Sequence, residues 1–83
     1  MKTDKNKVET QVKQILADQL DLDMVEIKKM DLLIDDLGID SFSSIEIVYD
    51  LEDKFGIEIP EKDLADVKTV DDIVTYIISR LSK

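Results

Sequence analysis

The chain has 83 residues, of which 20 are acidic and 11 are basic, and its formal net charge is -9. A chain of this length has room for one hydrophobic core, so we expect a single domain over residues 1–83. It contains no cysteine and no histidine. These absences exclude disulfides, a zinc knuckle, a thiol nucleophile and an imidazole base, so the sequence predicts a protein that is not an enzyme.

The negative charge is concentrated in the middle of the chain. Residues 31–66 carry twelve acids and two bases, whereas residues 1–30 sum to zero and residues 67–83 sum to +1. Such a charge disfavours nucleic acid and anionic lipid as partners, and it favours a basic protein surface. The acidic segment is therefore either a solvated face or a docking surface.

The first predicted element is an amphipathic helix over about residues 4–20. Its apolar face follows the helical period and consists of Val8, Val12, Ile15, Leu16 and Leu20. Residues 21–40 then lose this period but keep many apolar side chains, including Leu22, Val25, Ile27, Leu32, Leu33, Leu37 and Ile39. We therefore expect a long loop that packs its own side chains across the bundle.

A second helix is predicted from Ser41 to Phe55. Asp40 and Ser41 are suitable residues for its N-cap, and Gly56 is a suitable stop at its C-terminus. The face expected to join the core consists of Ser44, Ile47, Val48, Leu51 and Phe55. A short extended link follows over residues 57–59.

Two further helices complete the predicted fold. Pro60 occupies the first position of a short helix that extends to Asp66. Thr69 caps the last helix, with Asp72 three residues later in a short version of the capping box. The apolar face of this helix consists of Val70, Ile73, Val74, Ile77 and Leu81. The sequence therefore predicts an all-α fold: a small four-helix bundle with a long loop between helices 1 and 2.

The second helix also carries an apolar row that is offset from its core face. Phe42, Ile45 and Tyr49 form this apolar row at spacings of three and four residues, interleaved with acids. A small bundle cannot bury both rows fully. Either the loop over residues 21–40 covers the apolar row, or the row is partly exposed and serves as a contact surface.

Three phrases of the sequence resemble the acyl carrier protein family. They are DDLGIDSF at 35–42, IEIV at 45–48 and LEDKFGIEIP at 51–60. The family pattern is an Asp-Leu-Gly-x-Asp-Ser-Leu box, followed by an acidic helix, a Phe, a link ending in Ile-Pro and a last helix that opens with Thr-Val. Thr69 and Val70 match that opening, so the resemblance covers essentially the whole chain.

The resemblance implies a carrier with a covalent 4′-phosphopantetheine arm. By the match to the box, Ser41 would receive the arm and Asp40 would help to orient the metal-bound cofactor of the modifying enzyme. The arm's thiol would hold acyl groups as thioesters for fatty-acid or related biosynthesis. The implied docking surface consists of Phe42, Ile45, Glu46, Tyr49, Asp50, Glu52 and Asp53. Its partners would be a holo-carrier synthase (phosphopantetheinyl transferase) and acyl-processing enzymes with basic patches. We expect a cytoplasmic monomer without membrane insertion.

Departures from the family pattern leave the pathway open. Phe42 stands where Leu is usual, and Ser43 stands where an acid is frequent. The alternatives are a specialised carrier of a polyketide, peptide-type or D-alanyl pathway and, in another class, an unmodified acidic adaptor domain. A calcium-binding loop is excluded, because no register of the aspartates over residues 21–40 places Gly at position six and an acid at position twelve. No metal site is predicted.

The charge distribution predicts that salt stabilises the protein. The like charges over residues 31–66 repel one another at neutral pH, and added salt screens that repulsion. We therefore expect the midpoint of thermal unfolding to rise from low to moderate ionic strength and to rise further with a divalent cation. Circular dichroism melts across a salt series provide the measurement. A midpoint that stays flat over that series would contradict the prediction.

Overall fold

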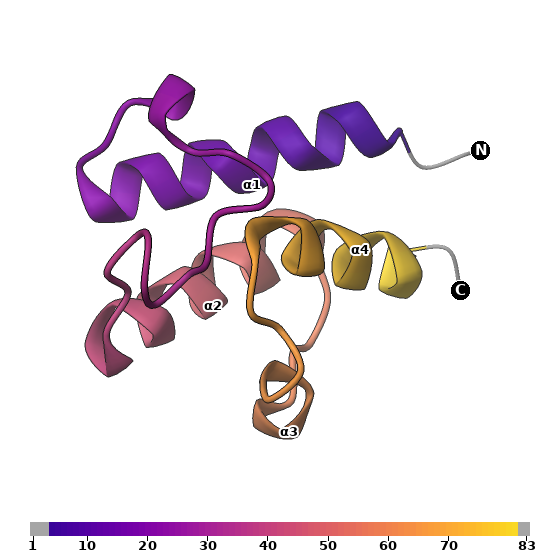
Figure 1. Ribbon diagram of the computed structural model, residues 1–83. Coiled ribbons are helices and arrows are strands. Elements are labelled where there is room, and N and C mark those ends of the chain that lie inside the picture. Colours follow the sequence, from indigo (N-terminus) through magenta and orange to yellow (C-terminus); the bar gives the residue numbers. More distant parts are fainter. Residues whose placement is uncertain (1–3, 82–83) are drawn as a thin grey trace.

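The computed structural model describes residues 4–81, and it is built from helices. Their order along the chain is α1 (Lys5–Leu20), the 3₁₀ turn η1 (Met24–Glu26), α2 (Ser41–Phe55), α3 (Glu61–Leu64) and α4 (Val70–Leu81). The predicted all-α bundle of four helices, one of them short, is confirmed. In Figure 1 α1, α2 and α4 form the body of the molecule, and α3 projects from it at the bottom of the view.

Local capping fixes the ends of the helices. Asp4 caps α1 and accepts hydrogen bonds from the backbone of Asn6 and Lys7. α1 ends at Asp21, whose φ of 58° lies in the left-handed region that aspartate tolerates better than most residues. Gly56, with φ of 65°, ends α2 in the same conformation, as its position in the sequence predicts.

The capping box at α4 is also confirmed. The backbone N–H of Asp72 donates to the Thr69 hydroxyl at 3.1 Å, and Asp72 Oδ2 accepts from the backbone N–H of Thr69 at 3.1 Å. The same carboxylate oxygen accepts from the backbone N–H of Lys68 at 2.9 Å. The bond from Asp72 satisfies a donor that the first helical turn leaves without an intrahelical partner, and the other two fix the chain that enters the helix.

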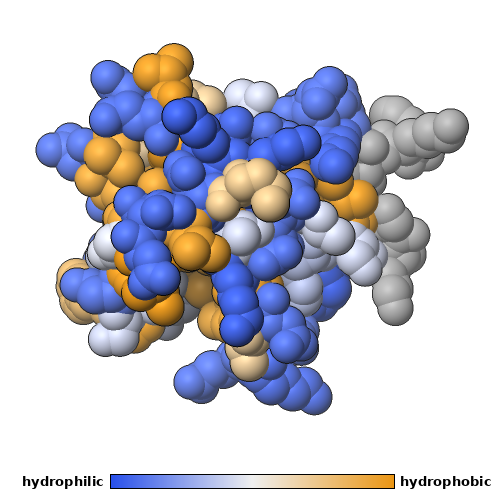
Figure 2. Space-filling view, viewed as in Figure 1, coloured by the Kyte–Doolittle hydropathy of each residue, from blue (hydrophilic) through white to orange (hydrophobic). Residues whose placement is uncertain are grey.

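The surface is mostly polar, but it exposes several large apolar side chains. Figure 2 shows apolar side chains scattered among hydrophilic ones, chiefly on the side where the loop over residues 21–40 leads into α2. Those at least a third exposed are Val25, Met30, Leu32, Ile34, Phe42, Ile45 and Tyr49. The loop therefore does not bury all of its apolar residues: the expectation of packing was wrong for Val25 and Leu32, which are 85% and 39% exposed.

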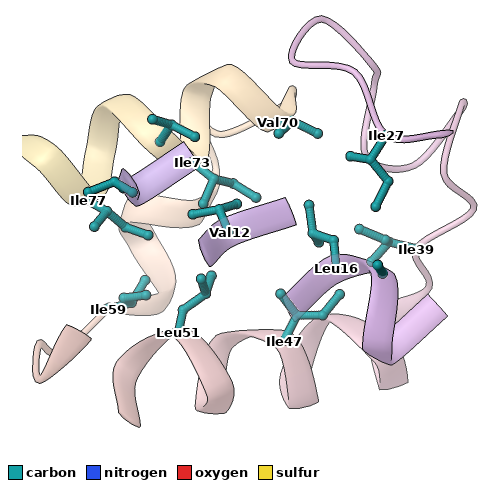
Figure 3. Close-up of a cluster of buried hydrophobic side chains, with 13 residues drawn as sticks. Val12, Leu16, Ile27, Ile39, Ile47, Leu51, Ile59, Val70, Ile73 and Ile77 are labelled. Carbon is teal, nitrogen blue, oxygen red and sulfur yellow. The ribbon is translucent and has the colours of Figure 1, made fainter. Parts of the chain in front are cut away.

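α1, α2 and α4 meet in one core, to which the loop and the link before α3 add side chains (Figure 3). The buried residues are Val8, Val12, Leu16, Ala17, Ile27, Ile39, Ile47, Leu51, Ile59, Val70, Ile73, Val74 and Ile77. The centres of the predicted apolar faces are thus confirmed. The predicted core members Ile15, Leu20, Ser44, Val48, Phe55 and Leu81 are only half-buried. Because only three long helices share the core, each of them buries a narrow stripe of its apolar face. The residues at the edges of that stripe therefore remain half-buried.

The loop between α1 and α2 is anchored by its backbone as well as its side chains. Leu33 donates to the carbonyl of Lys68 at 2.9 Å, and Asp71 donates to the carbonyl of Lys29 at 2.8 Å. Ile27 and Ile39 are both buried. The loop is thereby held against the start of α4, and its end fixes where α2 begins.

The third helix is shorter than predicted. It spans only four residues, with Pro60 as its N-cap rather than its first helical residue. The backbone N–H of Val67 bonds to the carbonyl of Leu64 at 3.1 Å, which closes a tight turn after the helix. The chain must leave the helix here, because residues 67–69 return to the body of the bundle to begin α4.

The capping box yields a stability prediction. The backbone N–H groups of Lys68 and Thr69 hold the pKa of Asp72 below its ordinary value. Asp72→Ala should lower the free energy of unfolding at neutral pH by about 1 kcal/mol. Because the folded pKa is lowered, this contribution is complete above the unfolded pKa of about 4 and disappears as pH falls through the folded value. Urea unfolding of parent and variant at neutral and acidic pH provides the measurement.

Asp71→Ala is the matched control for this experiment. This substitution removes a carboxylate from the same helical turn. The Asp71 carboxylate makes none of the three hydrogen bonds of the capping box. A loss of stability in Asp71→Ala equal to that in Asp72→Ala would contradict the assignment. So would a difference between parent and Asp72→Ala that persists unchanged in strong acid.

Candidate functional site

Ser41 is the first residue of α2, and it is exposed to solvent. Two features of the preceding chain position it there. Gly38 has a φ of 71°, which lets the loop turn before the helix. Asp40 then caps the helix, with its Oδ1 accepting from the backbone N–H of Ser43 at 2.8 Å. The Ser41 hydroxyl therefore lies at the N-terminus of a fifteen-residue helix, on a residue that is exposed to solvent.

The electrostatics of this position suit a phosphate group. The first turn of a helix has backbone N–H groups without intrahelical partners, and the helix dipole places partial positive charge there. The hydrogen bond from the Ser43 backbone holds the pKa of the Asp40 carboxyl below its ordinary value, so Asp40 is a carboxylate at neutral pH. Within residues 4–81, no group of three or more acidic side chains is arranged to hold a metal ion.

The apolar row next to Ser41 is exposed. Phe42 is 69%, Ile45 is 58% and Tyr49 is 67% exposed. This settles the two alternatives that the sequence left open: the loop does not cover the row. Three large side chains along one face of α2 thus form an exposed apolar surface that starts beside Ser41.

The four acids predicted to surround this row occupy two different environments. Glu46 and Asp53 are exposed, and their seven-residue spacing places them along one face of the helix. Asp50 is half-buried, and its Oδ2 accepts from Gln19 Nε2 of α1 at 2.6 Å. Glu52 is also half-buried, and its Oε2 accepts from the backbone N–H of Ile59 at 2.8 Å. Two of the four carboxylates are therefore bonded within the protein.

A cavity of about 470 Å³ lies beneath the site, and sequence analysis did not find it. α2, α3, α4 and the loop before α2 all contribute to its walls, which are mostly apolar and include Ile39, Ile47, Leu51, Leu64, Ile73 and Ile77. Its volume lies in the range of roughly 300–1,000 Å³ that is typical of small-molecule sites. The helical period shows which faces of the helices are apolar, but it does not show whether those faces pack tightly against one another. The one feature of the sequence that could have indicated a cavity is that apolar residues continue into the short α3.

Ser44 connects this cavity to the exposed end of α2. It lines the cavity, and its hydroxyl donates to the backbone carbonyl of Ser41 at 2.9 Å. The cavity therefore reaches the first turn of the helix that exposes Ser41.

Among the residues that the structure describes, no helix has the length and apolar character needed to cross a bilayer.

Residues 10–77 match the model of a family described as "Phosphopantetheine attachment site". Proteins named acyl carrier protein from Clostridium acetobutylicum and Helicobacter hepaticus are 47% and 44% identical to this chain over 66 residues. Each alignment covers 80% of this chain, and 86% and 87% of the respective relatives. The chain belongs to the acyl carrier protein family.

Solved structures agree with this assignment. A protein assigned as an acyl carrier protein from Mycobacterium tuberculosis superposes with a TM-score of 0.82 at 32% identity, over 88% of this chain and 97% of that one. A solution structure of one so assigned from Anaplasma phagocytophilum gives 0.80 at 29% identity, over 88% and 86% of the two chains. The fold of this acyl carrier protein is therefore that of its family.

Membership of the family sets the role of this acyl carrier protein. The family attaches 4′-phosphopantetheine, and its members carry acyl groups rather than convert them. When bound, the group supplies the thiol that the cysteine-free chain lacks. The exposed Ser41 hydroxyl, at a helix N-terminus suited to phosphate, fits such a group. An unmodified adaptor domain is not favoured by these comparisons.

The two environments of the acids predict different effects on stability. Glu52→Ala should lower the free energy of unfolding by about 1–3 kcal/mol, because it leaves the backbone N–H of the buried Ile59 without its partner. Asp53→Ala, one residue away, removes an exposed carboxylate and should change the free energy of unfolding by less than about 0.5 kcal/mol. Urea unfolding at neutral pH provides the measurement. Equal effects of the two substitutions would contradict the different structural roles assigned to Glu52 and Asp53.

Proposed function

We propose that Ser41 is the attachment residue of this acyl carrier protein. The observation that carries the proposal is the exposure of its hydroxyl at the capped N-terminus of α2. In the loading reaction the Ser41 oxygen would bond to the phosphorus of the phosphopantetheine group of coenzyme A. The bond from that phosphorus to the nucleotide would break, and the hydroxyl proton would leave to a base of the loading enzyme. The resulting phosphodiester would lie against the free N–H groups of the first helical turn.

Asp40 has two roles in the proposal. Its bond to the Ser43 backbone fixes the first turn of α2, in which Ser41 is the first residue. Its carboxylate, kept ionised by that bond through a lowered pKa, would also help to orient the metal ion that the loading enzyme brings with its cofactor. The family match supports the second role, and the cap geometry supports the first.

The exposed face of α2 would dock the partner enzymes. Phe42, Ile45 and Tyr49 supply apolar area, and Glu46 and Asp53 supply exposed negative charge beside it. This combination suits a partner with an apolar pocket rimmed by basic side chains, as expected of a phosphopantetheinyl transferase and of acyl-processing enzymes. Asp50 and Glu52 would add to the negative potential while their hydrogen bonds to Gln19 and Ile59 hold the helix in place.

The cavity beneath α2 would receive the apolar part of the cargo. It is largely lined by aliphatic side chains and reaches the first turn of α2 through Ser44. An acyl chain in this cavity would be removed from water, which is favourable in proportion to the apolar area buried. The pathway that we propose is fatty-acid biosynthesis, supported by relatives that are named simply as acyl carrier proteins.

Modification of Ser41 is directly testable by mass. Incubation of the purified protein with a phosphopantetheinyl transferase and coenzyme A should add one phosphopantetheine group. Ser41→Ala should abolish this addition, because no hydroxyl remains at the helix N-terminus. Intact-mass spectrometry, followed by fragmentation to locate the group, provides the measurement.

Two neighbouring serines offer matched controls. Ser43→Ala and Ser44→Ala remove hydroxyl groups from the same helical turn, and both variants should still be modified. Asp40→Asn keeps an acceptor for the cap whereas Asp40→Ala does not, so the pair separates loss of the cap from loss of the charge. Addition of the group to Ser41→Ala, or modification located at Ser43 or Ser44, would overturn the proposed site.

A further inference from the structure

The core cavity shares part of its wall with a second pocket at the surface. This outer pocket has a volume of about 320 Å³ and lies between α3 and α4, where Asp63, Asp66 and Asp72 line it together with Thr75. Val67 and Tyr76 line both spaces. Both are half-buried, and Tyr76 is the larger of the two, so the wall between the apolar cavity and the outer pocket includes its side chain.

A chain of hydrogen bonds holds Tyr76 in this position. Its hydroxyl donates to Asp63 Oδ2 at 2.6 Å, and Arg80 Nη1 donates to the same hydroxyl oxygen at 2.7 Å. Arg80 Nη1 also donates to the carbonyl of Glu58 at 2.6 Å, and its Cζ lies 5.8 Å from the centre of the Tyr76 ring. Linked bonds of this kind polarise and strengthen one another. We refer to Arg80, Tyr76 and Asp63 as the Tyr76 network.

The protonation of Tyr76 suits its place in the network. Burial and the bond to Asp63 raise the pKa of the hydroxyl, and Arg80 only partly opposes them. The hydroxyl therefore keeps its proton at neutral pH and remains a donor to Asp63 while it accepts from Arg80.

The network also connects the least anchored helix to the body of the molecule. α3 has four residues, none of them buried, and it projects from the bundle in Figure 1. Its packing on the core is limited to the half-buried Leu64. The bond between Tyr76 and Asp63 therefore fixes α3 to α4 at the point where both helices border the cavity.

We propose that Tyr76, held by Asp63 and Arg80, closes the cavity toward the outer pocket and limits the length of the acyl chain that the carrier accommodates. This inference rests on the proposed function, in which the cavity receives the cargo. While the network is intact, the cavity keeps its volume of about 470 Å³. When it is broken, Tyr76 can turn and α3 can move away, so that the cavity joins the outer pocket and takes longer chains.

The test compares the stability of the carrier loaded with saturated acyl chains of increasing length. Each methylene that enters the cavity is removed from water and should raise the midpoint of thermal unfolding. The midpoint should stop rising once the chain fills the cavity as far as Tyr76. In Tyr76→Phe, which keeps the ring but loses both hydroxyl bonds, this plateau should move to longer chains by at least one member of the series. A general loss of stability would instead lower all midpoints together without moving the plateau.

Three further variants separate the network from a general effect of charge. Asp63→Ala should move the plateau as Tyr76→Phe does, and Asp63→Asn, which keeps an acceptor, should restore it toward that of the parent. Asp66→Asn is the matched control: it removes a carboxylate from the same outer pocket, outside the network, and should leave the plateau unchanged.

A second measurement does not depend on loading. In unmodified protein, Tyr76→Phe should raise hydrogen exchange at the amides of Asp63 and Val67 by on the order of tenfold, because α3 loses a hydrogen bond to α4.

The outcomes separate this inference from the function on which it rests. A parent whose midpoint is independent of chain length would show that the cavity takes no cargo; the proposed role of the cavity and this inference would both fall, whereas attachment at Ser41 would stand. A parent with a plateau that Tyr76→Phe and Asp63→Ala leave in place would overturn the inference alone. Unchanged hydrogen exchange in Tyr76→Phe would likewise overturn the role of the network in holding α3.

Discussion

The packing of α1 against both α2 and α4 is the constraint on which the rest of the structure depends. Val12 and Leu16 of α1 are fully buried at the centre of the core. Because one helix supports the other two, α2 and α4 are held in place without having to close on each other. The space between them is bounded instead by the short α3 and by the loop before α2, and that space is the cavity. The cavity is thus a consequence of how few helices share the core.

The fold could be predicted from sequence because its signals are local. The period of apolar residues locates α1, α2 and α4, and single capping residues such as Asp40, Gly56 and Thr69 locate their ends. The position of Ser41 at a helix N-terminus follows from the same signals. The length of α3 could not be predicted, because its end depends on where the chain must return to the core and not on a residue within it.

The features that sequence could not provide depend on contacts between distant segments. Glu52 and Asp53 are adjacent acids on one helix, yet only Glu52 lies near the backbone N–H of Ile59 after the chain has turned at Gly56. The exposure of Phe42, Ile45 and Tyr49 depends on the path of the loop, which its composition does not determine. Surfaces and cavities depend on how distant segments pack together, whereas each helix depends on the residues of one short stretch of sequence.

The anchoring of the loop to the start of α4 has a consequence for the order of folding. The loop bonds through Leu33 to Lys68 and through Lys29 to Asp71, and these partners lie far along the chain. α1 and α2 can form from local contacts as soon as their residues are available, at the low entropic cost of short-range pairing. The turn over residues 32–39 has local hydrogen bonds of its own, such as that from Ile39 to Leu33, but its bonds to residues 68–71 can form only after those residues have been synthesised and docked. We therefore expect the anchoring of this loop to α4, rather than its local turns, to be among the last contacts to form.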